Sequence, residues 1–177
     1  MRLCILAAIA LGAIGCADPP TADETPRSAD LFYAAEESAA ELANSAAAEW
    51  GEFGFNFLVT TEKPAGQLFS EIRIVDRVCA DWPGTPENAI GCAYAVRQTA
   101  SGLLRDSAMT ARAQGDEVAF IVEIQRGSNI RREILHELGH VAGFCHVDGP
   151  VVMHSVANAA EHLTSADLSH PCDKDEP

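Results

Sequence analysis

The sequence predicts an α+β fold in which five strands are covered by two helices. Residues 31–50 and 130–141 carry apolar side chains at steps of three and four, the spacing of an amphipathic helix. Between them lie five short stretches rich in β-branched and aromatic residues, each bounded by turn residues, as is typical of strands. The 177 residues, of which 47% are apolar, suffice for one domain with its own core.

The first helix is expected over residues 31–50, where it would back the sheet. Polar residues such as Glu37 and Glu41 fall on the side opposite to the apolar stripe. A stripe of this kind packs against a core while the polar side faces water. Its apolar members are Leu31, Ala35, Ala39, Leu42, Ala46 and Trp50.

Five strands are expected after this helix, where β-branched and aromatic residues become frequent. A hairpin turn is expected at residues 99–102, and a surface loop at residues 79–88, which contain two prolines and a glycine. We expect the strand after the hairpin to be an exposed edge of the sheet. The five ranges are residues 55–60, 71–78, 90–96, 103–108 and 118–124.

The second helix is expected to begin after Ser128, a plausible N-cap, and to end at Gly143. Glycine enters the left-handed conformation of a helix C-cap without strain. Further on, Thr164 is followed three residues later by Asp167, a variant of the capping box. This pair predicts a short final helix in an otherwise small, irregular C-terminal subdomain.

Three histidines, two within the second helix and one shortly after its end, form a candidate metal site. His136 and His140 lie one helical turn apart on the same face, so both rings can reach one ion. Gly143 allows the chain to reverse, so that His146 can return as a third nitrogen ligand. Three protein ligands leave a fourth position open, as in catalytic zinc sites. Glu137, beside the first ligand, can accept a proton from a water molecule that zinc activates.

The alternative is that these histidines are ordinary hydrogen-bonded helix residues. That interpretation leaves the register of Glu137 and Gly143 relative to the histidines unexplained, and chance seldom produces the whole pattern. We therefore expect one Zn²⁺ ion as the cofactor.

The stretch HELGHVAGFCH at residues 136–146 matches H-E-x-x-H-x-x-G-x-x-H, and the chain resembles the metzincin metallopeptidases over roughly residues 30–170. The resemblance implies that His136, His140 and His146 bind zinc and that Glu137 is the catalytic base. It also implies that Met153 forms the methionine-containing turn beneath the metal; a methionine that merely fills the core is the alternative. The expected order of one helix followed by five strands is similar to that of the family, and the resemblance implies that the strands form one twisted, mixed sheet.

The chain departs from the family pattern at several positions. Val147, after the third histidine, leaves the metzincin subfamily open, and Ser155 stands where some members carry a tyrosine ligand, so no fifth ligand is expected. His154 either lines the cleft or lies on the surface. His162 and His170 are expected at the surface or as capping residues.

Residues 1–15 have the layout of a bacterial signal peptide, with Arg2 followed by an apolar run too short to span a membrane. The following segment, ending in Cys16, resembles a lipobox, which implies cleavage before Cys16 and its lipidation. Residues 16–29 are rich in proline and acidic residues and are expected to be a flexible linker, followed by the metallopeptidase domain at residues 30–177. We expect a protein of the bacterial cell envelope, anchored to a membrane by lipid; ordinary secretion is the alternative.

Four cysteines lie within the expected domain: Cys79, Cys92, Cys145 and Cys172. An even number of cysteines in an exported domain favours disulfides. Of the three possible pairings, we favour Cys79 with Cys92 and Cys145 with Cys172, because each closes a local or terminal segment. Reduced or partly zinc-bound thiols remain the alternative.

The charge balance excludes some partners. With 12 Lys and Arg against 26 Asp and Glu, the net charge of −14 repels nucleic acids and anionic lipid surfaces. We expect a monomeric zinc endopeptidase that hydrolyses peptide bonds of peptides or proteins outside the cytoplasm. The alternatives are a catalytically weak zinc-containing lipoprotein that acts as a binding scaffold, or a hydrolase of cell-wall peptide cross-links.

Overall fold

The computed structural model describes residues 30–66, 68–82, 85–100, 102–108, 118–155 and 160–172. The expected signal peptide and linker, with Cys16, lie outside these residues. None of the helices among these residues combines the length and the apolar composition that a membrane-spanning segment requires.

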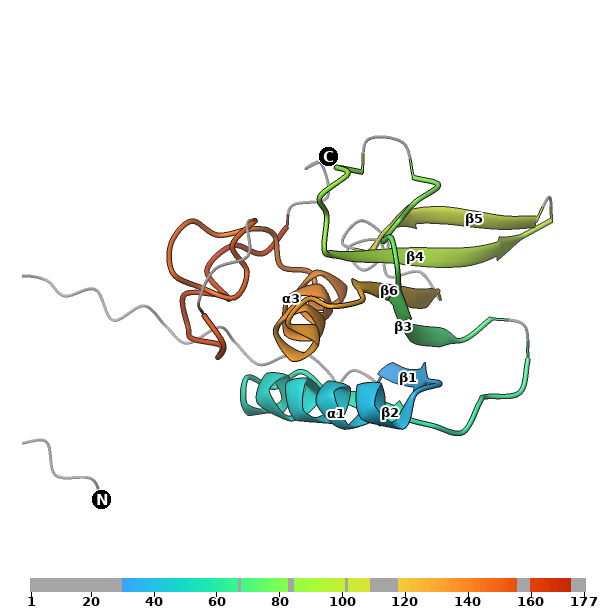
Figure 1. The fold of residues 1–177 in the computed structure, drawn as a ribbon, viewed down its shortest axis with the longest axis horizontal. Coiled ribbons are helices and arrows are strands. Elements are labelled where there is room, and N and C mark those ends of the chain that lie inside the picture. The colour runs from blue at the N-terminus through green and yellow to red at the C-terminus, as the bar shows by residue number, and fades with distance from the viewer. Residues whose placement is uncertain are drawn as a thin grey trace, which may run out of the picture.

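The protein has an α+β fold built on one mixed sheet of six strands, which confirms the predicted class (Figure 1). The strand order is β2-β1-β3-β6-β4-β5. The first four strands in that order run parallel, and β4 pairs antiparallel with both β6 and β5. The bounds are β1 Asp30–Ala34, β2 Phe57–Thr60, β3 Ser70–Val75, β4 Gly91–Thr99, β5 Gly102–Ser107 and β6 Ala119–Gln125.

All five expected strands are present, but β1 is a sixth strand where the start of the first helix was predicted. Phe32 and Ala34 point into the core with no exposed surface, whereas Leu31 is 46% exposed. This alternation is the period of a strand. Leu31 and Ala35 also fit helical spacing, so the apolar pattern alone did not separate the two elements. Residues 30–34 form a strand because they pair in parallel with β2 on one side and with β3 on the other.

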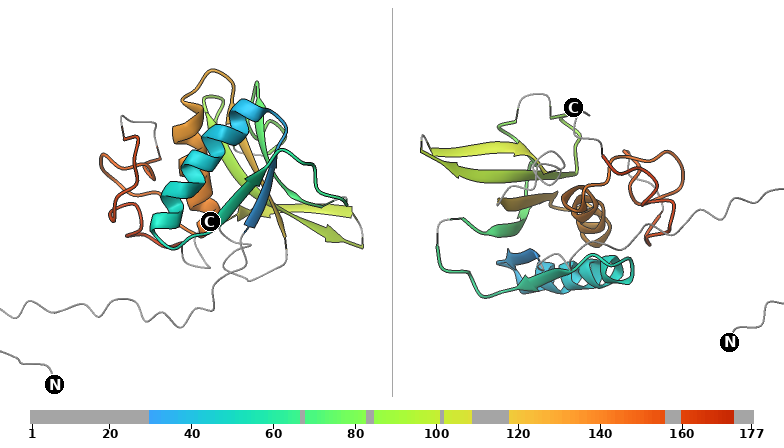
Figure 2. Two further views of the ribbon diagram at one scale, coloured as in Figure 1. Left: turned by 90° about the horizontal axis from the view of Figure 1, so that it is seen from below. Right: turned by 180° about the vertical axis from the view of Figure 1, so that it is seen from behind.

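Two helices of the described chain, α1 (Glu37–Glu52) and α3 (Ile130–Ala142), pack against each other on one face of the sheet (Figure 2). The core between helices and sheet is continuous and contains the fully buried ring of Trp50. The Trp50 indole N–H donates a 2.8 Å hydrogen bond to the carbonyl of Leu135, which fixes α1 against α3.

The C-terminal part of the chain is irregular and lies beside α3, on the side away from the strands (Figure 1). Residues 164–169 form turns in place of the predicted final helix. The Asp167 carboxylate accepts hydrogen bonds from the Thr164 N–H and hydroxyl, as the capping pattern predicts. The chain then leaves the turn, and Pro171 forms a bridge with Phe144 beyond the end of α3, so no helix follows within the described residues.

Both favoured disulfides are present. Cys79–Cys92 fastens the loop after β3 to the start of β4, and Cys145–Cys172 fastens the C-terminal segment to the chain just beyond α3. Neither pair is therefore free to bind a metal as thiolates.

Candidate metal centre

Helix α3 carries two of the three histidines, and both of its ends are capped. The side chain of Asn129 accepts a hydrogen bond from the Arg132 N–H, so the N-cap is Asn129 and not Ser128 as predicted. At the other end, Gly143 has φ of 98°, the left-handed conformation predicted for it. The chain therefore turns back directly after the helix, which brings His146 towards the first two histidines.

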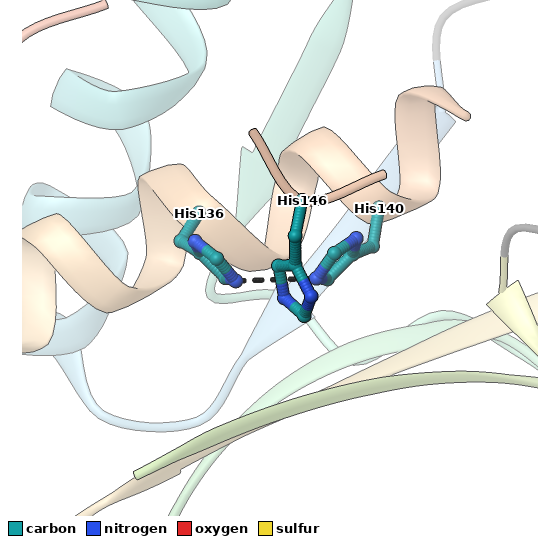
Figure 3. A group of neighbouring side chains, drawn as sticks. All are labelled: His136, His140 and His146. Atoms are coloured by element: carbon teal, nitrogen blue, oxygen red, sulfur yellow. Dashed lines mark hydrogen bonds between the residues drawn. The ribbon is translucent and has the colours of Figure 1, made fainter. Parts of the chain in front are cut away.

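His136, His140 and His146 converge on one point, as Figure 3 shows. Their candidate ligand atoms all lie within 4.8 Å of one another, and the Nε2 atoms of His136 and His140 are 3.1 Å apart. Two nitrogens bound to one zinc ion at about 2.1 Å in tetrahedral geometry are roughly 3.4 Å apart. This group could hold a metal ion.

The hydrogen bonds of the Nδ1 atoms of His136 and His140 determine which nitrogen of each ring has a free lone pair. His136 Nδ1 lies 2.7 Å from the Val152 carbonyl oxygen, and His140 Nδ1 lies 2.8 Å from that of Phe144. A carbonyl only accepts hydrogen bonds, so both Nδ1 atoms carry the proton. In neutral rings both Nε2 atoms then present lone pairs to each other. A cation between them is the species that satisfies both, and a carbonyl on the outer nitrogen is the usual support of a metal-binding histidine.

Burial keeps these rings neutral. It lowers the pKa of His140 to about 4, and burial together with the nearby His140 lowers the pKa of His136 well below its ordinary value. Partial burial, followed by the neighbouring His154, also lowers the pKa of His146. Neutral imidazole is the form that binds metals, so the site needs no deprotonation at neutral pH.

Glu137 is buried between α3 and the first residue of β4, with 4% of its surface exposed. A Cβ atom added to Gly91 would come within 2.3 Å of its Oε1, so the lack of a side chain at Gly91 lets the strand lie directly against this carboxyl group. Burial, and next the carboxylate of Glu133 one turn earlier, raise the pKa of Glu137 to about 8. A carboxyl with a pKa near neutrality can both accept and return a proton.

Met153 lies directly beneath the turn of helix that separates the two histidines. Its side chain is fully buried, and a Cβ atom on Gly139 would come within 2.2 Å of its sulfur. Its N–H donates to the Asp167 carboxylate at 2.8 Å, and its carbonyl accepts from the Val147 N–H at 2.9 Å. Met153 is thus fixed on both sides, and one of its bonds holds the residue after His146.

The loop that carries His146 is held by the C-terminal segment. The Cys145 N–H donates to the His170 carbonyl, and the Cys172 N–H donates to the Gly143 carbonyl. The Cys145–Cys172 disulfide closes this short pairing. His146 is more open to solvent than the two helix histidines, so its position depends mainly on its backbone.

The sequence also predicted a surface position for His162 and an edge position for strand β5. His162 is exposed and contacts Glu49 on α1, consistent with the predicted surface position. Strand β5 is an edge of the sheet, as expected, but β4 and β6 are the strands that pack against α3. The pairing of β4 with β5 begins at Tyr94, so within the described chain residues 91–93 pair only with β6.

Three contributors to the site were not predicted from the sequence: Gly91, Arg132 and the carbonyl of Val152. Arg132 and Glu133 precede the histidines and look like solvent-facing charges, yet each is only 3% exposed. A charged residue one helical turn before His136, on its face, was the available signal, since residues four apart on a helix are neighbours.

Comparison with known proteins found no matching family model and no matching curated relative.

Proposed function

We propose that the protein is a zinc-dependent endopeptidase. The observation that carries the proposal is the convergence of His136, His140 and His146, with the Nε2 atoms of the first two 3.1 Å apart. The buried acid Glu137 is the residue directly after His136. A bound zinc ion would supply an activated water molecule and polarise the carbonyl of the peptide bond. The similarity of residues 136–146 to the metzincin signature supports the same function.

In this proposal the chain's own residues move the proton and support the ligands. Glu137 takes the proton of the attacking water and passes it to the leaving amine nitrogen, so the products are one free carboxylate and one free amine. Met153 supports the floor of the site through its contact with Gly139. No covalent bond between protein and substrate forms.

An extended substrate strand would add to the sheet beside residues 91–93, because their outer edge has no strand partner within the described chain. These residues adjoin Glu137 through Gly91. We therefore place the substrate strand beside residues 91–93 and not at β5, the edge expected from the sequence, because β5 packs less closely against α3 than β4 does.

The low exposure of Glu137 favours a second candidate function, a zinc-binding scaffold with little hydrolytic activity. A general base must reach water and substrate, and a carboxylate covered by strand β4 has restricted access. Both candidates retain the same histidine site, so only measured hydrolysis separates them.

The test is zinc content and peptide hydrolysis by the purified full-length chain, using a mixed peptide library. Glu137→Gln is expected to lose about 10²- to 10⁴-fold in rate with its zinc content unchanged. Glu41→Gln, at an exposed position of α1, is the matched control and should cleave like the original chain. Zinc bound without cleavage would establish the scaffold, and cleavage unaffected by Glu137→Gln would overturn the proposed mechanism.

We also propose that the protein lies in the bacterial cell envelope, anchored through a lipid on Cys16. The lipobox-like segment and the two disulfides, which suit an oxidising compartment, support this location. In detergent phase partitioning, the exported Cys16→Ala variant should move to the aqueous phase, whereas the original protein should stay in the detergent phase. A variant that partitions like the original protein would count against the lipid anchor.

A further inference from the structure

Arg132 is a buried charge within the group of side chains behind the candidate metal site. It is 3% exposed, and arginine is seldom buried to this degree without a specific partner. Its partner is the next residue: Nη1 lies 3.0 and 3.1 Å from the two carboxylate oxygens of Glu133. Removing such a pair from water is costly, and apolar replacements often match its stability. Stability alone therefore does not explain the pair.

The other arm of the guanidinium reaches a support of the first histidine. Arg132 Nη2 donates a 3.0 Å hydrogen bond to the Val152 carbonyl, the same oxygen that lies 2.7 Å from His136 Nδ1. A carbonyl oxygen has two lone pairs, and here both are used. The guanidinium thus restrains the peptide group that sets the orientation of the His136 ring.

Glu133 makes this arrangement compatible with a metal ion. A guanidinium without a counter-charge, one helical turn from a ligand, would repel a bound dication. The carboxylate of Glu133, held against Nη1, balances that charge locally. Arg132 therefore positions the Val152 carbonyl, and Glu133, the next residue on the same turn of α3, balances the charge of Arg132.

We propose that Arg132 is a positioning residue for the metal ligand His136, acting through the Val152 carbonyl, with Glu133 as its charge partner. The inference rests on the proposed zinc site. Residues that orient histidine ligands in this way typically contribute about 10- to 100-fold to metal affinity. Arg132 does not touch the metal or the substrate, so its effect should appear in metal binding before any assay of hydrolysis.

The test measures zinc dissociation constants of the full-length chain by chelator competition, together with the visible spectrum of the cobalt-loaded protein. The variant Arg132→Met/Glu133→Met removes both charges and leaves neither unpaired. It is expected to bind zinc about 10- to 100-fold more weakly and to show an altered cobalt spectrum. Arg132→Lys keeps the charge but not the forked geometry, and its affinity should fall between those of the double variant and the original chain.

Arg131→Met is the matched control. Arg131 is the neighbouring arginine of α3, and it bonds Glu49, Ser45 and the Glu161 carbonyl, none of which contacts a histidine ligand. This control should lose folding stability but leave the zinc dissociation constant within about twofold, since its contacts are remote from the site. A purely structural role for Arg132 would make both arginine variants alike in zinc affinity.

The outcomes separate the inference from the proposed function. If the original chain binds no zinc, the proposed function itself fails. If the original chain binds zinc and the double variant binds it equally well with the same cobalt spectrum, only the role of Arg132 is overturned. Should the double variant fail to fold, Arg132→Lys decides, because unchanged zinc affinity in this variant would also overturn the inference.

Discussion

The two helix histidines and the loop histidine are held in different ways. His136 and His140 are 6% and 8% exposed, and each Nδ1 faces a backbone carbonyl. His146 is exposed, and its backbone is fastened by the C-terminal segment through pairing and a disulfide. Two of the candidate ligands are therefore placed by the helix, whereas the third depends on Cys172, which is bonded to Cys145 across a sequence separation of 27.

The candidate site therefore has a preformed half, His136 and His140, and a conditional half, His146. The preformed half follows from helical geometry and burial, and should persist without the metal. The conditional half depends on long-range contacts that can be broken separately. A change to one half, or to the contact between the halves, can therefore be compared with a matched change elsewhere in the chain.

The largest effect is expected from removing the disulfide beside His146. Cys145–Cys172 and Cys79–Cys92 span 27 and 13 positions, and loop-closure entropy gives each about 3 to 4 kcal/mol of stability. Cys145→Ser/Cys172→Ser should lose this stability and weaken zinc binding as well. Cys79→Ser/Cys92→Ser should lose stability alone.

Denaturant unfolding and zinc competition on both double variants provide the measurement. If the two variants lose zinc affinity equally, the third ligand does not depend on the C-terminal segment, and the division into two halves is wrong.

The same division shows what the sequence could predict. The spacing of His136, Glu137, His140 and His146 is local, and helix geometry with a glycine C-cap converts it directly into three converging rings. Gly143 takes the conformation predicted for it, and both favoured disulfides form. These features depend on residues close in sequence or on a small set of alternatives.

Features that depend on tertiary contacts were predicted less well. Leu31 and Ala35 fit a helix as well as a strand, and only pairing with β2 and β3 selects the strand. Asp167 was predicted to cap a helix; it caps a turn, and its second oxygen holds Met153. The burial of Arg132 depends on the Val152 carbonyl twenty residues away, which no local pattern reveals.

The next largest effect concerns the pH dependence of the preformed half. Glu137 has a pKa of about 8 in the folded protein against an ordinary value of 4.5. Between these two pH values the folded chain keeps a proton on Glu137 that the unfolded chain has released. The stabilisation that comes from this protonated carboxyl therefore falls steadily as the pH rises from 4.5, and it is fully lost above about 8. At about 1.4 kcal/mol per pKa unit, the loss by pH 7 is about 3 kcal/mol in metal-free protein.

Glu137→Gln removes this titration. The free energy of unfolding of the metal-free variant should exceed that of the original chain increasingly between pH 5 and pH 8. The histidines, whose lowered pKa values act in the opposite direction, are present in both proteins and cancel in the difference. A difference that stays constant with pH would show that Glu137 is not buried as a neutral acid.

The smallest effect is expected where the two halves meet, at the contact between Gly139 and Met153. A methyl group at Gly139 would come within 2.2 Å of the sulfur and 3.0 Å of the Trp50 ring, both fully buried. Such overpacking costs about 1 to 3 kcal/mol, whereas alanine gains about 1 kcal/mol over glycine inside a helix. Gly139→Ala should therefore lose up to about 2 kcal/mol.

Gly51→Ala separates these two terms, because a methyl group at Gly51 on α1 would have no neighbour within 4 Å. This control should gain about 0.5 to 1 kcal/mol in denaturant unfolding. Because Met153 also bonds Val147, beside His146, Gly139→Ala should weaken zinc binding, and Gly51→Ala should not. A Gly139→Ala protein as stable as Gly51→Ala, with unchanged zinc affinity, would show that Met153 can move aside and that the two halves are independent.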